Sequence, residues 1–294
     1  NNKVTSFVTS LQLDGNGLSG AAAEIGPSLT TLLSIGRGCS ELATAPRAFL
    51  APQGGAALLR LNLAFNDLDG SIADLLPWGS ETLANVQFIS LAGNFLDGFL
   101  PEHAFTVPNA SSSNQEDNPR GHHGLTHLEE LHLNDNRLCG ELPVAMVLAS
   151  RQLRGPSSSP STRHGGSRPT VSLPKLRVLN VSSNLLRGSL QRLLLGSGDI
   201  NRDKGVCDST DATQSPLESL SIANNGFDDN AWQCLVAASR KFSPGHIDLF
   251  PALRSVDLRG NDFVAMPLAD VRLRLKRSLS PGATVLLSSQ SYYS

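Results

Sequence analysis

The chain has 294 residues, of which 40% are hydrophobic but only 5% aromatic, so aliphatic side chains must form most of its core. Its formal net charge of -2 excludes the strongly basic surface that nucleic acid or an acidic membrane selects. No apolar run approaches the roughly 18 residues of a membrane span. Composition therefore predicts one elongated domain over residues 1–294, without a nucleic-acid partner or a membrane span.

A template of the form L-x-x-L-x-L-x-x-N-x-L, with Val, Ile or Phe allowed at the Leu positions, occurs seven times along the chain. Internal repeats decide the fold class, because they mark a solenoid. A partial eighth copy covers 283–290, with Gln290 at the Asn position. The template asparagines are Asn16, Asn66, Asn94, Asn136, Asn184, Asn225 and Asn261.

Each part of the template has a physical reason. The L-x-L core alternates with period two, which predicts a short strand with its leucines inside and the intervening residues outside. The Asn amide carries both donors and an acceptor, and can satisfy backbone groups that no water reaches. One repeat cannot bury its own apolar face, so neighbouring repeats must stack and both ends need caps.

The first copy contains Gly15-Asn16-Gly17-Leu18-Ser19-Gly20, which fits the G-x-G-x-x-G pattern of a dinucleotide site. Because Asn16 and Leu18 are template positions, a turn of the repeat is the better interpretation. Residues 21–57 are long enough to hide a degenerate repeat, but their apolar residues do not fill the template. We therefore predict a helical excursion there.

After the Asn, several copies continue L-x-G-x-I/L-P. The matching residues are Leu68, Gly70 and Ile72; Leu96, Gly98, Leu100 and Pro101; Leu138, Gly140, Leu142 and Pro143; and Leu186, Gly188 and Leu190. This pattern resembles the plant-type subclass of leucine-rich repeat proteins, which occurs in receptor-kinase and receptor-like ectodomains. The resemblance implies an α/β solenoid, a horseshoe or superhelix with a parallel β-sheet on its concave face. It also implies a protein that recognises a ligand and is not an enzyme.

Most intervals between template asparagines exceed the roughly 20–29 residues of one leucine-rich repeat. Three polar insertions, at about 109–124, 151–169 and 196–216, are predicted to be flexible loops on one side of the solenoid. The convex side is predicted to be irregular or 3-10 in the early repeats. Apolar spacing predicts helices over 229–242 and 268–279 in the late ones.

No cofactor, metal or catalytic site is predicted. The histidines at 122, 123, 127 and 132 lack the H-E-x-x-H order of a zinc site and are more typical of flexible loops. The chain shows no P-loop, G-x-S-x-G or kinase signature. The chain carries 4 cysteines, of which Cys207 and Cys234 are a candidate disulfide if the protein is extracellular, whereas free thiols are the alternative. Asn109 and Asn180 lie in glycosylation sequons.

Outward strand positions form columns across the predicted concave face, where the fold constrains residues least. Mixed apolar and charged character suits a protein or peptide ligand. The candidate ligand-binding residues are Arg60, Phe88, Glu130, His132, Asn134 and Asn180. The alternative interpretation of each is a solvated strand residue.

Three functions fit this pattern. The first is the ligand-binding part of a receptor-like or secreted surface protein, located outside the cell or at its surface. The second is an intracellular scaffold or adaptor that uses the same face. The third is a regulatory region of a larger protein whose catalytic domain, such as a kinase, lies outside this chain.

Overall fold

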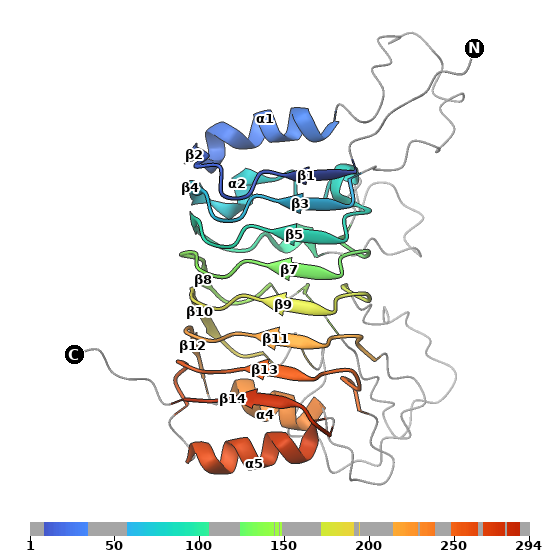
Figure 1. Ribbon diagram of the computed structural model, residues 1–294, viewed down its shortest axis with the longest axis vertical. Coiled ribbons are helices and arrows are strands. Elements are labelled where there is room, and N and C mark those ends of the chain that lie inside the picture. Colours follow the sequence, from blue (N-terminus) through green and yellow to red (C-terminus); the bar gives the residue numbers. More distant parts are fainter. Residues whose placement is uncertain are drawn as a thin grey trace, which may run out of the picture.

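Eight short parallel strands stack along the molecule and form its main sheet, in the order β1-β3-β5-β7-β9-β11-β13-β14 (Figure 1). The computed structural model describes residues 9–34, 58–105, 124–143, 145–146, 148, 172–190, 194, 214–228, 230–238, 248–263, 267–279 and 281–288. The strands are β1 (Ser10–Gln12), β3 (Arg60–Asn62), β5 (Phe88–Ser90), β7 (Glu130–His132), β9 (Val178–Asn180), β11 (Ser219–Ser221), β13 (Ser255–Asp257) and β14 (Thr284–Leu286). Each comes from one template copy, and β14 comes from the partial copy.

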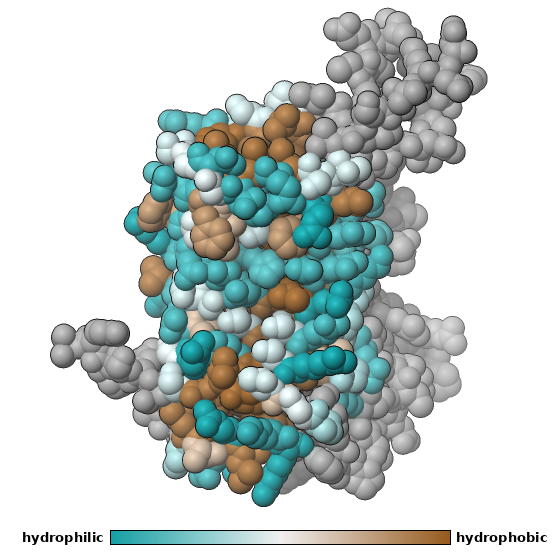
Figure 2. Space-filling view, viewed as in Figure 1, coloured by the Kyte–Doolittle hydropathy of each residue, from teal (hydrophilic) through white to brown (hydrophobic). Residues whose placement is uncertain are grey.

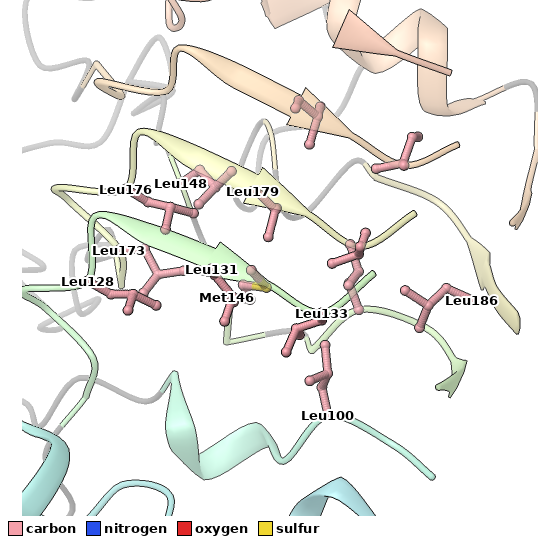
Figure 3. Packing of buried hydrophobic residues seen from close by; sticks show 14 of the residues in the cluster. Leu100, Leu128, Leu131, Leu133, Met146, Leu148, Leu173, Leu176, Leu179 and Leu186 are labelled. Atoms are coloured by element: carbon pink, nitrogen blue, oxygen red, sulfur yellow. The ribbon is translucent and has the colours of Figure 1, made fainter. Parts of the chain in front are cut away.

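The middle residue of each strand points into the interior, as the period-two pattern predicts. Leu61, Ile89, Leu131, Leu179 and Leu220 are fully buried and pair in register from strand to strand. Figure 3 shows leucines of successive repeats packed together behind the strands. Burying such a side chain contributes about 1.5–3 kcal/mol, so stacked leucines supply most of the stability of the solenoid.

The template asparagines form a hydrogen-bonded ladder beside the sheet. Asn94 Oδ1 accepts from the Leu68 N–H at 3.2 Å, and its Nδ2 donates to the carbonyls of Leu63, Leu91 and Ala92. The same pattern recurs in every later repeat up to Asn261. The predicted role of the asparagines, which is to satisfy backbone groups of neighbouring repeats, is confirmed.

The residues that follow the first six template asparagines, which include the L-x-G elements, form two smaller parallel sheets on a flank of the solenoid (Figure 1). One contains β2 (Ser19–Ala21), β4 (Asp67–Ser71) and β6 (Phe95–Asp97), and the other β8 (Cys139–Gly140), β10 (Leu185–Gly188) and β12 (Gly226–Phe227). The motif needs glycine because its backbone is left-handed. Gly98 has φ 77°, and a Cβ there would lie 3.1 Å from Ser71 Oγ of the preceding repeat.

The convex side follows the prediction. Early repeats carry the one-turn helix α2 (Ile72–Leu75) and the 3-10 turns η3 (Glu81–Leu83) and η4 (Glu102–Ala104), whereas late repeats carry α4 (Asn230–Ala238) and α5 (Leu268–Ser278). In α5 the buried residues Val271 and Leu275 face inward, four positions apart.

The helical excursion predicted after the first repeat is confirmed over α1 (Ala22–Ser34). β1 pairs directly with β3, and the described residues between them add no strand to the main sheet. Residues 35–57 and nearly all of the three predicted insertions lie outside the described residues. Figure 1 places α1 at one end of the stack and α5 at the other.

Candidate functional site

The concave face consists of the outward residues of the main sheet, and the register arranges them in rows. Arg60, Phe88 and Glu130 are successive Cα partners in one row. Ser90, His132 and Asn180 are successive partners in the next row. The parallel register therefore brings together residues that are far apart in the sequence, as the predicted columns require.

Four of the predicted ligand-binding residues contact one another and are called the Phe88 cluster: Arg60, Phe88, Glu130 and His132. The Arg60 guanidinium carbon lies 4.3 Å from the centroid of the Phe88 ring. The ring centroid of His132 lies 5.5 Å from that of Phe88, at an interplanar angle of 43°. His132 Nε2 lies 3.3 Å from Glu130 Oε2. Phe88 is thus held between a cation and an imidazole that a carboxylate orients.

The Phe88 cluster is accessible to a ligand but not fully solvated. Phe88 and His132 are half-buried, whereas Arg60 is exposed. A cation over an aromatic ring contributes about 0.5–1 kcal/mol at an exposed site and about 2 kcal/mol or more once water is removed. A ligand that covers these side chains would therefore strengthen the contact that already orients them.

The two predicted asparagines hydrogen-bond to residues one or two positions away, Asn134 to a side chain and Asn180 to both backbone and side chain. Asn134 Nδ2 donates to Asp135 Oδ2 at 2.7 Å. Asn180 Oδ1 accepts from the backbone N–H of Ser182 at 3.2 Å and from its hydroxyl at 2.7 Å. Asn62 makes the same local hydrogen bond as Asn180, because its Oδ1 accepts from the Ala64 N–H two residues later. A structural role in this local turn thus accounts for much of the polar character of Asn62 and Asn180.

The predicted glycosylation sites and the predicted disulfide each include one described residue and one that lies outside the described residues. Asn180 is half-buried in β9, and Asn109 lies outside the described residues, so glycosylation stays a prediction at both. Cys234 is buried and forms no disulfide with another described residue, and burial raises the pKa of its thiol to about 12. Cys207, its predicted disulfide partner, lies outside the described residues, so the disulfide also stays a prediction.

Histidines 122 and 123 also lie outside the described residues. The other two occupy defined positions: His132 belongs to β7, and His127 Nδ1 lies 3.3 Å from the Ala84 carbonyl. Among the described residues no group of three His, Cys, Asp or Glu side chains could hold a metal ion. Of the helices described, none combines the length and apolar character needed to cross a bilayer.

Sequence reasoning missed two features of the surface. The first is an ion pair between neighbouring repeats, in which Arg177 donates to both carboxylate oxygens of Glu218 at 3.0 and 3.2 Å. The second is a set of exposed apolar side chains on the flank, namely Phe65, Phe95, Phe99 and Leu185. A signal for the second existed, because Phe95 and Leu185 directly follow a template Asn, where other repeats carry Gly, Asp or Arg.

Comparison with known proteins agrees with this architecture. Residues 127–147 match the Leucine Rich Repeat family model. No curated protein matches the sequence significantly.

Many solved structures are similar to the chain, and three of them are plant receptors described below. One is the leucine-rich repeat ectodomain of the plant membrane receptor kinase GASSHO1/SCHENGEN3 from Arabidopsis thaliana, with 22% identity and a TM-score of 0.43, covering 80% of this chain and 19% of that one. Another is Pollen Receptor Kinase 3, with 17% identity and a TM-score of 0.44, covering 89% of this chain and 78% of that one. A third is the plant peptide hormone receptor RGFR1 in complex with RGF2, with 17% identity and a TM-score of 0.38, covering 80% and 28%.

These likenesses, at 17–22% identity, do not establish a function for this chain. The chain spans about a fifth of the first of these ectodomains, since it covers 19% of its length. The fold class rests instead on the chain itself, namely on its repeated template, its asparagine ladder and the parallel register of its strands. With the matched repeat at 127–147, these features give the chain the fold of a leucine-rich repeat solenoid, and its repeats resemble the plant-type pattern.

Proposed function

We propose that the chain recognises a protein or peptide ligand through the Phe88 cluster on its concave face. The observation that carries this proposal is the placement of Phe88, whose ring lies 4.3 Å from the Arg60 guanidinium carbon on an open sheet surface. Aromatic and arginine side chains are enriched where binding energy concentrates. A ring that its neighbours already orient loses little conformational freedom when a ligand covers it.

The charges of the Phe88 cluster indicate which ligand groups it suits. Arg60 offers donors to a carboxylate, and Glu130 beside His132 offers an acceptor to an ammonium or amide group. The Phe88 ring between them suits an apolar side chain. A peptide segment with an apolar residue between groups of opposite charge would therefore complement the surface.

We also propose that this ligand is met outside the cell or at its surface, as part of a receptor-like or secreted protein. The plant-type pattern of the repeats and the two sequons support this assignment. Material from the native source should carry a glycan on Asn109 or Asn180. Unmodified sequons together with free thiols at Cys207 and Cys234 would contradict the extracellular assignment while leaving ligand recognition standing.

Ligand recognition can be tested with matched variants. Native protein is used to capture ligands, and the affinity of each captured ligand for Phe88→Ala, Arg60→Ala and wild type is then measured by calorimetry. Ser219→Ala, on the same face in β11, serves as the control. Phe88→Ala should weaken binding by about thirtyfold, the loss that corresponds to about 2 kcal/mol at an interface hot spot. Equal affinity of Phe88→Ala and wild type for every captured ligand would refute the proposed site.

A further inference from the structure

Three phenylalanines stand exposed on the flank of the solenoid and are called the aromatic flank: Phe65, Phe95 and Phe99. Their exposures are 67%, 45% and 65%, whereas Phe105, Phe227 and Phe250 are fully buried. Single exposed apolar residues are common on proteins, but three aromatic rings on two consecutive repeats form a group. Figure 2 shows tan and brown side chains among teal ones over this part of the surface and along its left margin.

The rings of the aromatic flank are held in place by the neighbouring repeat. Phe65 lies against Gly93 and Phe99 against Gly140, so closely that a Cβ at either glycine would collide with the ring. The Arg137 guanidinium carbon lies 5.0 Å from the centroid of the Phe95 ring. Each ring is therefore oriented while a large part of it stays open to solvent.

Phe65 occupies a backbone position that disfavours it. It directly precedes a template Asn and has φ 55°, a left-handed conformation that bulky residues rarely adopt. The equivalent positions of the other repeats hold Gly15, Gly93, Asp135, Ser183, Asn224 and Gly260, all with positive φ. Because the ring is mostly exposed, the core gains little from phenylalanine here.

Beside the aromatic flank, three negatively charged aspartates outnumber the positive charge of Arg137, which lies over the Phe95 ring. Asp67, Asp69 and Asp97 are exposed on β4 and β6, and Asp69 is the Cα partner of Phe95. Among the described residues, no ion pair engages these three carboxylates. Strand alternation places the side chains of Asp67, Asp69, Phe95 and Asp97 on the outward face, because Leu68 and Leu96 point inward.

We propose that the aromatic flank and the aspartates of β4 and β6 form a second docking surface, for a basic protein segment in which Lys or Arg alternates with apolar side chains. Apolar side chains would cover the three rings, and the cations would pair with Asp67, Asp69 and Asp97. This surface lies on the flanking sheet and not on the concave face. The inference is therefore independent of the Phe88 cluster and of the proposed function.

The test uses a labelled short peptide of alternating Lys and Leu as the probe and a Glu and Leu peptide as its charge-reversed control. Binding to the full chain is followed by fluorescence anisotropy. The first variant combines Phe65→Asn with Phe99→Ala, and the second combines Asp67→Asn, Asp69→Asn and Asp97→Asn. Asn224 already occupies the position equivalent to Phe65, so the first variant should fold. The matched control is Leu273→Ala, which removes an exposed apolar side chain from α5.

The wild type should bind the Lys and Leu peptide at least about tenfold more tightly than either variant, with Leu273→Ala unchanged. Binding should weaken as salt rises in the wild type but much less in the aspartate variant, because exposed charges are screened. Equal binding of the two peptides, or of the wild type and both variants, would overturn the proposal. The proposal would also be overturned if the wild type formed a dimer that the Phe65→Asn and Phe99→Ala variant did not form, because the aromatic flank would then bind a second copy of the chain. Loss of peptide binding in Phe88→Ala would also overturn it by moving the site to the concave face.

Discussion

Replacing Asn94 by alanine tests the structural role of the asparagine ladder directly. The side chain is buried and makes four hydrogen bonds to the backbone of two repeats. Three of its partners keep another donor. The Leu63 carbonyl also accepts from Asn66 Nδ2, the Leu91 carbonyl from Asn136 Nδ2, and the Ala92 carbonyl from the Phe65 N–H. The Leu68 N–H, in the buried interior, loses its acceptor on Asn94.

The hydrogen bonds lost in Asn94→Ala determine how far the free energy of unfolding should fall. A buried N–H left without an acceptor costs about 1–3 kcal/mol, and three weakened carbonyl bonds add about 0.5 kcal/mol each. The free energy of unfolding should therefore fall by roughly 3 kcal/mol, a large part of the about 5–15 kcal/mol that stabilises a typical domain. Asn16→Ala is the matched control, since Asn16 is exposed and, among the described residues, its Nδ2 donates to the Asp14 carbonyl alone. Its effect should stay within about 0.5 kcal/mol.

Urea unfolding followed by circular dichroism measures both variants. With a slope of about 2–3 kcal/mol per molar urea, Asn94→Ala should lower the unfolding midpoint by about 1–1.5 M. Hydrogen exchange should speed up first in β4 and β6, because a repeat is stabilised mainly by its neighbours. If Asn94→Ala and Asn16→Ala destabilised the protein equally, the ladder would not be the source of the stability assigned to it.

Three further changes follow from the structure. Phe65→Asn should raise the free energy of unfolding by about 1 kcal/mol, because asparagine tolerates the left-handed conformation. A lower unfolding temperature for this variant than for the wild type would contradict backbone strain at Phe65. Hydrogen bonding to Arg177 lowers the pKa of Glu218, so the stabilisation by this ion pair is present above the usual Glu pKa and is lost as the pH falls through the lowered value. Arg177→Ala should therefore lower the free energy of unfolding slightly at neutral pH, but not at a pH below the lowered pKa of Glu218. An equal loss of stability at both pH values would exclude the ion pair as the cause of the loss. Burial raises the pKa of the Cys234 thiol to about 12, so iodoacetamide should label the half-buried Cys139 faster than Cys234 in the folded, reduced protein, with the two rates converging in denaturant. Mass spectrometry of the labelled peptides, without reduction, would also reveal the predicted Cys207 to Cys234 disulfide.

The main sheet was predictable because its signal is local. The spacing of Leu58, Leu61, Leu63 and Asn66 alone specifies a strand, its inward face and the turn that follows it. The Phe88 cluster was predictable for a related reason, since equal spacing in each copy places Phe88 between Arg60 and Glu130. Only the rotamers that bring the Arg60 and His132 side chains onto the ring required the structure.

The surface contacts were harder to predict because they depend on side-chain conformation. Arg177 and Glu218 hold the same template position, directly after Leu176 and Leu217, but the spacing does not show that their side chains form an ion pair. Phe65 is exposed because it lies in a left-handed turn. A sequence usually reveals such a turn by a Gly or Asn, and here Phe stands in its place. Counting apolar residues along the chain assigns such a phenylalanine to the core.

The insertions leave the register of the main sheet intact because of where they enter the repeat. In the sequence, each predicted insertion begins after the L-x-G element and ends before the next described strand of the main sheet. Extra loop length costs little, since each doubling of a loop adds only about 0.6 kcal/mol of closure entropy. The pairs Phe88↔Glu130 and Glu130↔Val178 therefore keep the same register despite predicted insertions between them. A continuous concave surface thus depends on the short template and not on a constant repeat length, and a ligand can contact Arg60, Phe88 and His132 as neighbours.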